Sequence, residues 1–268
     1  MDKRKNIYRI LRFISSNTKN KIPYFIIILV TFFKIKRITL YYTIYSYLEW
    51  IDNNVDNNLS DEVEVEKFLQ NQKEILFFNR EPNNEFEYLG KLIFLSKHSE
   101  NYKPLYESFL EIQKNDFKRK FKLLDRVSLE NRNIKLGILS LKICASIFKD
   151  KKILNDQIQL DTLAKFYIQV DNLIDYKKDY KIGYINIPLE IYSFKRYEEF
   201  YFSDPKVRNY LENLKVNLLL KSSQCENILR NYSYFSVFGI FLKSMFLQKK
   251  NKTSKIQIRN IVKLNILN

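Results

Sequence analysis

Two groups of aspartates at helical spacing, far apart along the chain, are the residues best suited to chemistry. The first group is Asp52 and Asp56, and the second is Asp171, Asp175 and Asp179. Residues four apart share one face of a helix, so each group points its carboxylates in one direction. Proteins usually hold Mg²⁺ by a few carboxylate oxygens, completed by water and a substrate phosphate. Two such helices facing each other would therefore form a cage for a diphosphate.

Both aspartate groups lie in apolar, aromatic stretches. Trp50 and Ile51 crowd the first group, and Tyr167, Val170 and Leu173 crowd the second. Aspartates four apart also occur on ordinary solvated helix faces, which is the alternative interpretation of each group. Carboxylates in an apolar wall are costly unless something pairs with them, and this favours a bound cation.

The second group opens a longer motif. Asp175-Tyr-Lys-Lys-Asp179 is followed by Gly183 and then by Pro188-Leu-Glu190. This spacing reproduces, without a gap, the Asp-x-x-x-Asp…Gly-Arg-x-Tyr-Leu-Pro pattern of the squalene/phytoene synthases. The chain therefore resembles this family, whose members are all-helical enzymes that condense two prenyl diphosphates head to head.

Other segments support the resemblance in the family's order and cover most of the chain. Asp52 and Asp56 match the outer aspartates of its Asp-Asp-x-x-Asp motif, and Asn53 replaces the middle one. Asp116 follows an amphipathic run, as a mid-chain aspartate of the family does. Gly137 matches a helix-breaking glycine that precedes the second motif.

The resemblance implies Mg²⁺ as cofactor, prenyl diphosphates as substrates and release of diphosphate. Lys36 and Arg37 match the family's basic pair and, with Lys181, are expected to contact the diphosphate. Aromatic side chains such as Tyr42 and Tyr167 would line a dry tunnel and stabilise a passing cation. The expected catalytic residues are Tyr45, Asp52, Asp56, Asp171 and Asp175, and the expected metal ligands are Asp52, Asp56, Asp171, Asp175 and Asp179.

Three arginines of the family are replaced in this chain. Their positions hold Glu49, Ile174 and Tyr184, and Asn186 stands where the family has a tyrosine. Arginine suits diphosphate because its planar fork grips phosphate oxygens with two hydrogen bonds. The replacements keep two alternatives open beside the prenyltransferase. These are a class I terpene synthase on the same fold and a non-catalytic relative that serves as a binding or assembly factor.

Composition favours one all-α domain over residues 1–268, and the resemblance implies an isoprenoid synthase-type bundle around a central cavity. The chain has only 4 Gly and 5 Pro, and it has no Gly/Ser-rich or Pro-rich linker. Most apolar runs recur at helical spacing. Asp161 is expected to cap one helix, and residues 79–84 are expected to form a loop around Pro82. The expected helices include 105–117, 136–148, 163–174 and 232–247, the last interrupted by Gly239.

The chain is strongly basic, with 46 Lys+Arg against 30 Asp+Glu and a net charge of +16. The basic clusters 118–122 and 249–252 have the sign that anionic lipid or nucleic acid would attract. A composition rich in Lys, Asn and Ile also raises the charge without any partner. No nucleic-acid-binding motif is recognisable, so no nucleic acid partner is expected.

The most hydrophobic window is 23–33, which is too short to span a membrane. We interpret it as a buried first helix, and peripheral membrane contact stays open because polyprenyl substrates partition into lipid. Cys144 and Cys225 have no metal-ligand spacing and indicate a reducing compartment, so a cytoplasmic location is expected. His98, the only histidine, is expected on the surface in a loop. A Ser-His-Asp triad or a zinc site is therefore nearly excluded.

Overall fold

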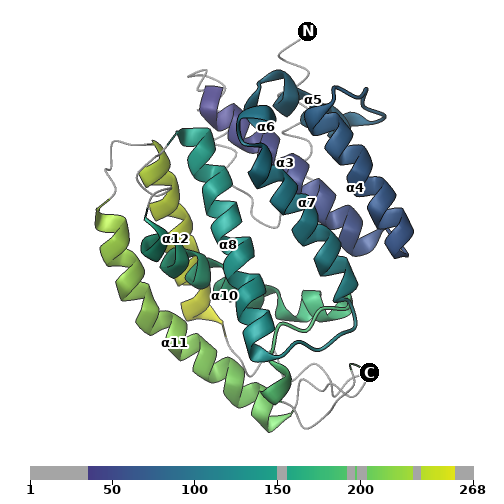
Figure 1. Ribbon diagram of the computed structural model, residues 1–268. Helices are drawn as coiled ribbons and strands as arrows, with labels where there is room; N and C mark the ends of the chain where they lie inside the picture. The colour runs from purple at the N-terminus through teal and green to yellow at the C-terminus, as the bar shows by residue number, and fades with distance from the viewer. Residues whose placement is uncertain (1–35, 150–155, 192–196, 198–203, 232–236, 257–268) are drawn as a thin grey trace. The chain divides into compact units, whose positions relative to one another are not determined.

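Helices make up the regular secondary structure of the residues that the structure describes (Figure 1). The computed structural model describes residues 36–149, 156–191, 197, 204–231 and 237–256, and no strand occurs within these ranges. The expectation of an all-α protein is therefore confirmed, whereas the isoprenoid synthase-type arrangement stays a prediction. The helices are α3 (Lys36–Asn57), α4 (Glu62–Phe77), α5 (Glu85–Leu95), α6 (His98–Asn101), α7 (Lys103–Lys118), α8 (Arg126–Phe148), α10 (Gln157–Lys181), the short 3-10 helix η1 (Leu189–Ile191), α11 (Pro205–Arg230) and α12 (Val237–Lys255).

Side-chain caps explain where several helices begin. Asp61 accepts a hydrogen bond from the Glu64 amide at the start of α4, and Asp125 accepts one from Ser128 at the start of α8. Such caps satisfy amide groups that have no partner inside the helix. The helix α10 is capped by Asp156, so the expectation that Asp161 would be the cap is wrong. An aspartate five residues upstream reaches the first free amides, and this leaves Asp161 inside the helix.

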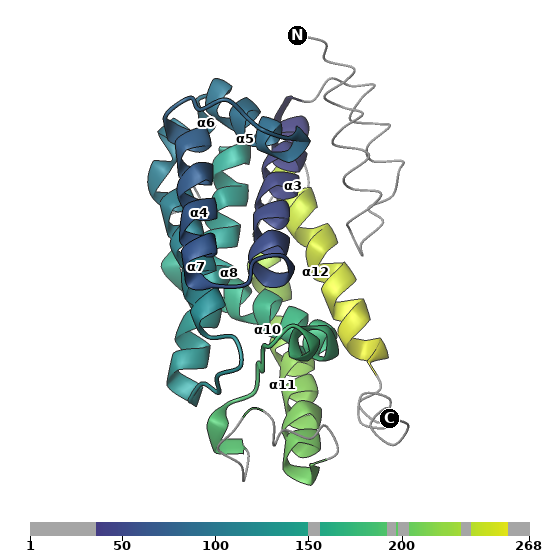
Figure 2. The ribbon, with the colours of Figure 1, turned by 90° about the vertical axis from the view of Figure 1, so that its right-hand side faces the viewer.

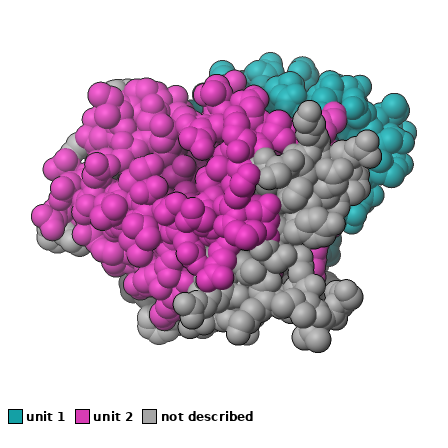
Figure 3. Space-filling view, turned by 90° about the horizontal axis from the view of Figure 1, so that it is seen from below, with its two compact units in different colours: residues 1–118 teal, residues 119–268 magenta. Residues whose placement is uncertain are grey.

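The described helices fall into two compact units, residues 1–118 and 119–268, coloured separately in Figure 3. The first unit contains α3 to α7, and the second contains α8 to α12. The expectation of one functional domain over the whole chain stays a prediction.

In the first unit, α3 packs against α5 and α7, and α4 packs against the same two helices. Tyr47 of α3 is fully buried, and its hydroxyl donates to Gln72 Oε1 at 2.9 Å. Gln72 Nε2 in turn donates to Glu87 Oε1 at 3.2 Å. The Tyr47 ring lies so close to α5 that a Cβ atom at Gly90 would sit 2.6 Å from its Cζ. This polar chain therefore joins three helices inside the unit.

The prediction of an exposed His98 is wrong. His98 begins α6, its exposed fraction is only 6 %, and its Nδ1 lies 2.8 Å from the hydroxyl of Tyr106. Its ring also lies against Tyr102, with centroids 4.8 Å apart. The flanking Ser-Glu suggested a solvated loop, but a hydrogen bond to a buried tyrosine makes burial of the imidazole favourable.

In the second unit, α10 is the central helix and packs against α8, α11 and α12 (Figure 2). The helices α8 and α10 approach closely at Gly137 of α8, where a Cβ atom would lie 2.8 Å from the carbonyl oxygen of Ala164 on α10. The helix α8 runs through Gly137 without a break, so the expectation of a helix-breaking glycine is wrong at this position. The absence of a side chain at Gly137 allows α8 and α10 to approach each other closely.

Most of the expected helices are confirmed, and they are longer than predicted. The windows 105–117, 136–148 and 163–174 lie inside α7, α8 and α10, and 79–84 is a loop between α4 and α5. The window 232–247 overlaps α12 from residue 237 onward, and α12 continues through Gly239, so the predicted interruption is wrong. Residues 232–236 and the hydrophobic window 23–33 lie outside the described residues. No helix in the described part of the chain is long and apolar enough to cross a membrane.

We predict that Gly137→Ala lowers the free energy of unfolding by about 1–3 kcal/mol, because the new methyl group would press against a backbone oxygen. Without that contact, Gly→Ala in a helix interior stabilises by about 1 kcal/mol, so the sign of the change is diagnostic. Urea unfolding followed by circular dichroism measures it. Ser140→Ala, on the exposed face of the same helix, is the control and should be close to neutral. A stabilising Gly137→Ala would contradict the close approach of α8 and α10.

Candidate diphosphate and metal site

The helix α10 carries three of the predicted aspartates on one face. Asp171, Asp175 and Asp179 are each one turn apart, and we call them the α10 ladder. Val170 and Leu173 are buried on other sides of the same helix. Because the apolar positions fix the rotation of α10, the three aspartates lie along the same side of it.

Asp179 is the most perturbed carboxylate of the ladder. Burial, and after it the negative charge of Asp175, raises its pKa to about 7. Asn186 Nδ2 donates to Asp179 Oδ2 at 2.8 Å. A pKa near neutrality in a partly buried cluster of charges is typical of functional sites, although structural networks also produce it. Asp175 and Asp179 therefore lie close enough for one charge to change the ionisation of the other.

Arg119 brings a guanidinium group to the same place. Its exposed fraction is 8 %, and its Cζ lies 4.3 Å from the centroid of the Tyr184 ring. Arg119 donates to Asn186 Oδ1 at 3.3 Å, so Asn186 bridges the arginine and Asp179. The charges of Lys178, Arg119 and Arg132 act to lower the pKa of Asp179, against the larger effect of burial. Arg119, which is distant from Tyr184 in the sequence, thus stacks on the Tyr184 ring. Tyr184 itself stands at the position where the squalene/phytoene synthases have an arginine.

A tight turn after α10 holds Arg119 and Asn186 in place. Gly183 has φ +100°, a backbone conformation that favours glycine, and the next amide, of Tyr184, donates back to the carbonyl of Asp179 at 2.8 Å. The amide of Phe121 donates to the carbonyl of Gly183, also at 2.8 Å. The segment that follows Arg119 therefore runs beside the segment that carries Asn186. This is the physical reason for the glycine of the motif.

Asp171, at the other end of the ladder, is ion-paired with Lys249 of α12. The ammonium nitrogen of Lys249 also lies 5.7 Å from the centroid of the Tyr167 ring. Tyr167 is buried, and its hydroxyl donates to the carbonyl of Leu242 at 3.0 Å. A lysine therefore already neutralises the first carboxylate of the ladder.

The remaining predicted site residues lie mainly on α3, in the first unit. Asp52 and Asp56 are half-buried, and Arg37 is exposed in the first turn of the helix. Tyr45 is half-buried, and its ring stacks on that of Tyr41 with centroids 6.0 Å apart. Since α3 and α10 belong to different units, the expectation that their aspartates face each other across a cavity stays a prediction.

Two predicted basic residues mark the ends of these helices. Lys181 is the last residue of α10 and is exposed. Lys36 is the first residue of α3, and its side chain lies outside the described residues. Their expected contacts with a diphosphate stay predictions.

The α10 ladder fits Mg²⁺ as a site of two carboxylates. Within the described ranges, no three His, Cys, Asp or Glu side chains come together around a common point. Mg²⁺ does not require such a cage, because it is commonly bound by one or two carboxylates, several waters and substrate phosphates. Asp175 and Asp179 supply the two carboxylates, and their mutual repulsion is the kind of energy that a divalent cation removes.

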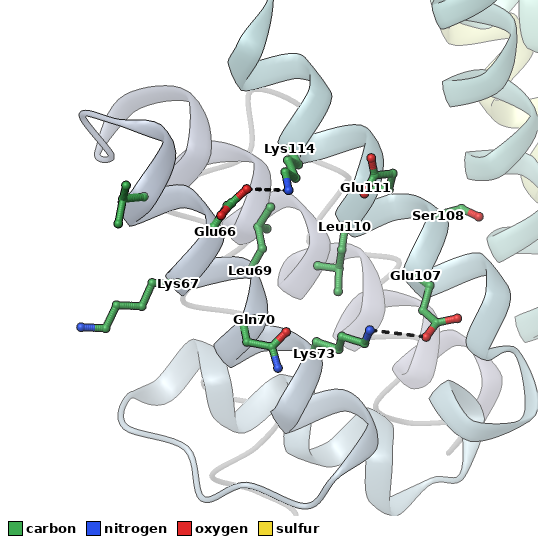
Figure 4. A pocket seen from close by; sticks show the side chains of 11 residues that line it. Glu66, Lys67, Leu69, Gln70, Lys73, Glu107, Ser108, Leu110, Glu111 and Lys114 are labelled. Carbon is green, nitrogen blue, oxygen red and sulfur yellow. Dashed lines mark ion pairs between the residues drawn. The ribbon is translucent and has the colours of Figure 1, made fainter.

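A groove of about 870 Å³ lies between α4 and α7, and no predicted site residue lines it (Figure 4). Ion pairs bridge it, with Glu66 and Lys114 at 2.6 Å and Lys73 and Glu107 at 3.9 Å. Its lining is charged and solvated, and it contains none of the aspartates of either group. The groove therefore has no part in the site described above.

Arg119, Arg132 and Lys249 are the site residues that the sequence did not reveal. The sequence places Arg119 and Lys249 in the basic clusters 118–122 and 249–252, which have the sign that an anionic partner would attract. The structure uses Arg119 beside Asp179, and it pairs Lys249 with Asp171 and Lys250 with Glu226. In the sequence, Arg119 lies three residues after Asp116, which matches a mid-chain aspartate of the family that the chain resembles.

No family model matches this chain, and no curated protein matches it. The resemblance to squalene/phytoene synthases therefore depends on the motifs quoted above. The geometry of the α10 ladder is an observation independent of that resemblance.

We predict that Asp179 makes the free energy of unfolding fall as pH rises from about 4 to 7. The reason is that its pKa in the folded protein is raised above the unfolded value, which is about 3.9. Below pH 4 the carboxyl is protonated in both states, and its favourable contribution is complete. Asp179→Asn imitates the neutral acid, so the variant should keep that stability at pH 7. Thermal unfolding at a series of pH values measures the difference.

Asp161→Asn on the same helix is the control and should retain the pH dependence of the wild type. Asp175→Asn should move the decline in stability to lower pH, because it removes one of the charges that raise the pKa of Asp179. Identical pH profiles for the wild type and Asp179→Asn would show that the carboxyl is not perturbed.

Proposed function

We propose that this chain is a Mg²⁺-dependent prenyltransferase of squalene/phytoene synthase type, which condenses two prenyl diphosphates and releases diphosphate. One observation carries the proposal: Asp175 and Asp179 share a partly buried face of α10 with Arg119 beside them. Carboxylates can hold the metal ion, and a guanidinium can hold phosphate oxygens. An acidic pair next to a buried guanidinium can bind both parts of a metal–diphosphate complex. Such a site therefore suits the complex better than it suits the metal ion or the diphosphate alone.

In this proposal, different residues of the second unit bind the metal ion, orient its ligands and add positive charge. Asp175 and Asp179 would hold the ion, and Asn186 fixes the orientation of the Asp179 carboxylate through its hydrogen bond. When bound, Mg²⁺ supplies charge neutralisation for the departing diphosphate. Arg119 and Arg132 would add positive charge and so compensate in part for the replaced arginines.

The first unit has a corresponding part in the proposal. Asp52 and Asp56 on α3 would hold metal, and Arg37 would contact the diphosphate. Tyr45 and the other tyrosines of α3 would provide aromatic faces for the allylic cation. Tyr41 and Tyr42 form an aromatic pair there, with centroids 5.3 Å apart.

A second candidate function is a non-catalytic binding or assembly role on the same scaffold. The observation that favours it is the ion pair between Lys249 and Asp171, since a resident cation already satisfies one predicted metal ligand. The replacement of family arginines by Glu49, Ile174 and Tyr184 favours the same alternative. Binding and turnover measurements separate the two candidates.

We predict that Mg²⁺ together with pyrophosphate raises the melting temperature of the wild-type protein by several degrees, because the ligand binds only the folded state. Asp175→Ala should abolish the shift, since it removes one of two carboxylates from the metal site. Differential scanning fluorimetry measures the effect, with Mg²⁺ alone and pyrophosphate alone as reference conditions. Asp161→Ala, on the same helix, should keep the wild-type shift. Absence of a shift in the wild type at millimolar ligand would favour the non-catalytic candidate.

We also predict that purified protein with Mg²⁺ and farnesyl or geranylgeranyl diphosphate forms a hydrocarbon that joins two substrate chains. Asp52→Ala and Asp175→Ala should each lower turnover at least about 100-fold, because leaving-group stabilisation is worth several kcal/mol. Circular dichroism should show unchanged helix content in both variants. A cyclic product from one substrate would indicate a terpene synthase, and no product from either substrate would exclude both enzymes for these chain lengths.

A further inference from the structure

A nearly buried lysine holds the first carboxylate of the α10 ladder. The Lys249 side chain is 13 % exposed, whereas that of its partner Asp171 is 49 % exposed. The Lys249 ammonium is paired with that carboxylate and also lies over the Tyr167 ring, 5.7 Å from the ring centroid. An ammonium removed this far from water needs a paired anion, and an aromatic face adds to its stabilisation. The contact is therefore part of how α12 packs on α10.

The next lysine in the chain behaves differently. Lys250 pairs with Glu226 of α11, and both of these side chains are 35 % exposed. Two successive lysines thus tie α12 to two different helices, and only Lys249 reaches the ladder. Lys250 therefore offers a matched control of equal charge, one residue away on the same helix.

We infer that the Lys249 ammonium takes the place of a metal ion on Asp171, so that α10 presents a two-carboxylate metal site at Asp175 and Asp179. The inference rests on the proposed function only in that it takes the α10 ladder as the metal site. An ammonium and Mg²⁺ compete for the same carboxylate oxygens, and Lys249 is held beside Asp171 by the packing of α12. Lys249 is thus a positioning residue that keeps Asp171 from binding metal.

The test is a calorimetric titration of the full-length protein with MgCl₂. Lys249→Met keeps an unbranched apolar side chain beside Tyr167 but removes the charge, so Asp171 becomes available. The variant should bind Mg²⁺ about tenfold more tightly than the wild type, because one carboxylate ligand is added to the site. Lys250→Met removes the same charge without uncovering a carboxylate of the ladder, and it should match the wild type.

A double-mutant cycle with Asp171→Asn completes the test. In the wild-type background this substitution should change Mg²⁺ affinity by less than about twofold, since only a screened charge is lost. In the Lys249→Met background it should remove the gain. Circular dichroism of each variant checks folding, and the single Asp171→Asn variant tests the inference even if Lys249→Met does not fold. A large loss of affinity from Asp171→Asn alone would overturn the inference.

The outcomes separate this inference from the proposed function. Equal affinities for the wild type and Lys249→Met overturn the inference and leave the proposed function standing. Binding by Lys249→Met but not by the wild type supports the inference and overturns the proposed function in favour of the non-catalytic candidate. Absence of Mg²⁺ binding in every variant overturns both.

Discussion

Negative charge on a central helix is the constraint on which the second unit depends. The helix α10 is surrounded by α8, α11 and α12, yet three aspartates line one of its faces. Ionised carboxylates so close together, and partly removed from water, repel one another and lose solvation. The structure supplies positive charge at both ends of the ladder, from Lys249 at one end and from Arg119 and Arg132 at the other. The neighbouring elements must therefore supply these cations to α10 as well as apolar surface.

The turn at Gly183 shows how the chain meets this constraint from a distant part of the sequence. The amide of Phe121 donates to the carbonyl of Gly183, and the amide of Leu189 donates to the carbonyl of Leu124, each at 2.8 Å. The two segments run beside each other through these backbone contacts, which do not depend on side-chain identity. Arg119, just before the first contact, is thereby held near Asn186.

The all-α class and the ladder could be predicted from the sequence because both follow from local spacing. Errors arose where a tertiary contact decides the outcome. Gly137 resembles a helix breaker in isolation, but it is needed for the close approach to Ala164. His98 has polar neighbours in sequence and a buried tyrosine in space. Arg119 and Lys249 could not be assigned because a basic cluster gives no information about which of its members turns inward.

The attachment of α12 has a consequence for how the second unit responds to ionic strength. Charged contacts of Lys249 and Lys250 join this helix to α10 and α11, and both pairs are partly open to solvent. At physiological ionic strength the screening length is about 8 Å, and it shortens further as salt is added. Salt therefore weakens the attachment of α12 more than it weakens the apolar packing between α8 and α10. The helix α12 is the part of this unit whose amide hydrogens should exchange with solvent sooner at high salt, through local opening that leaves the rest of the bundle folded.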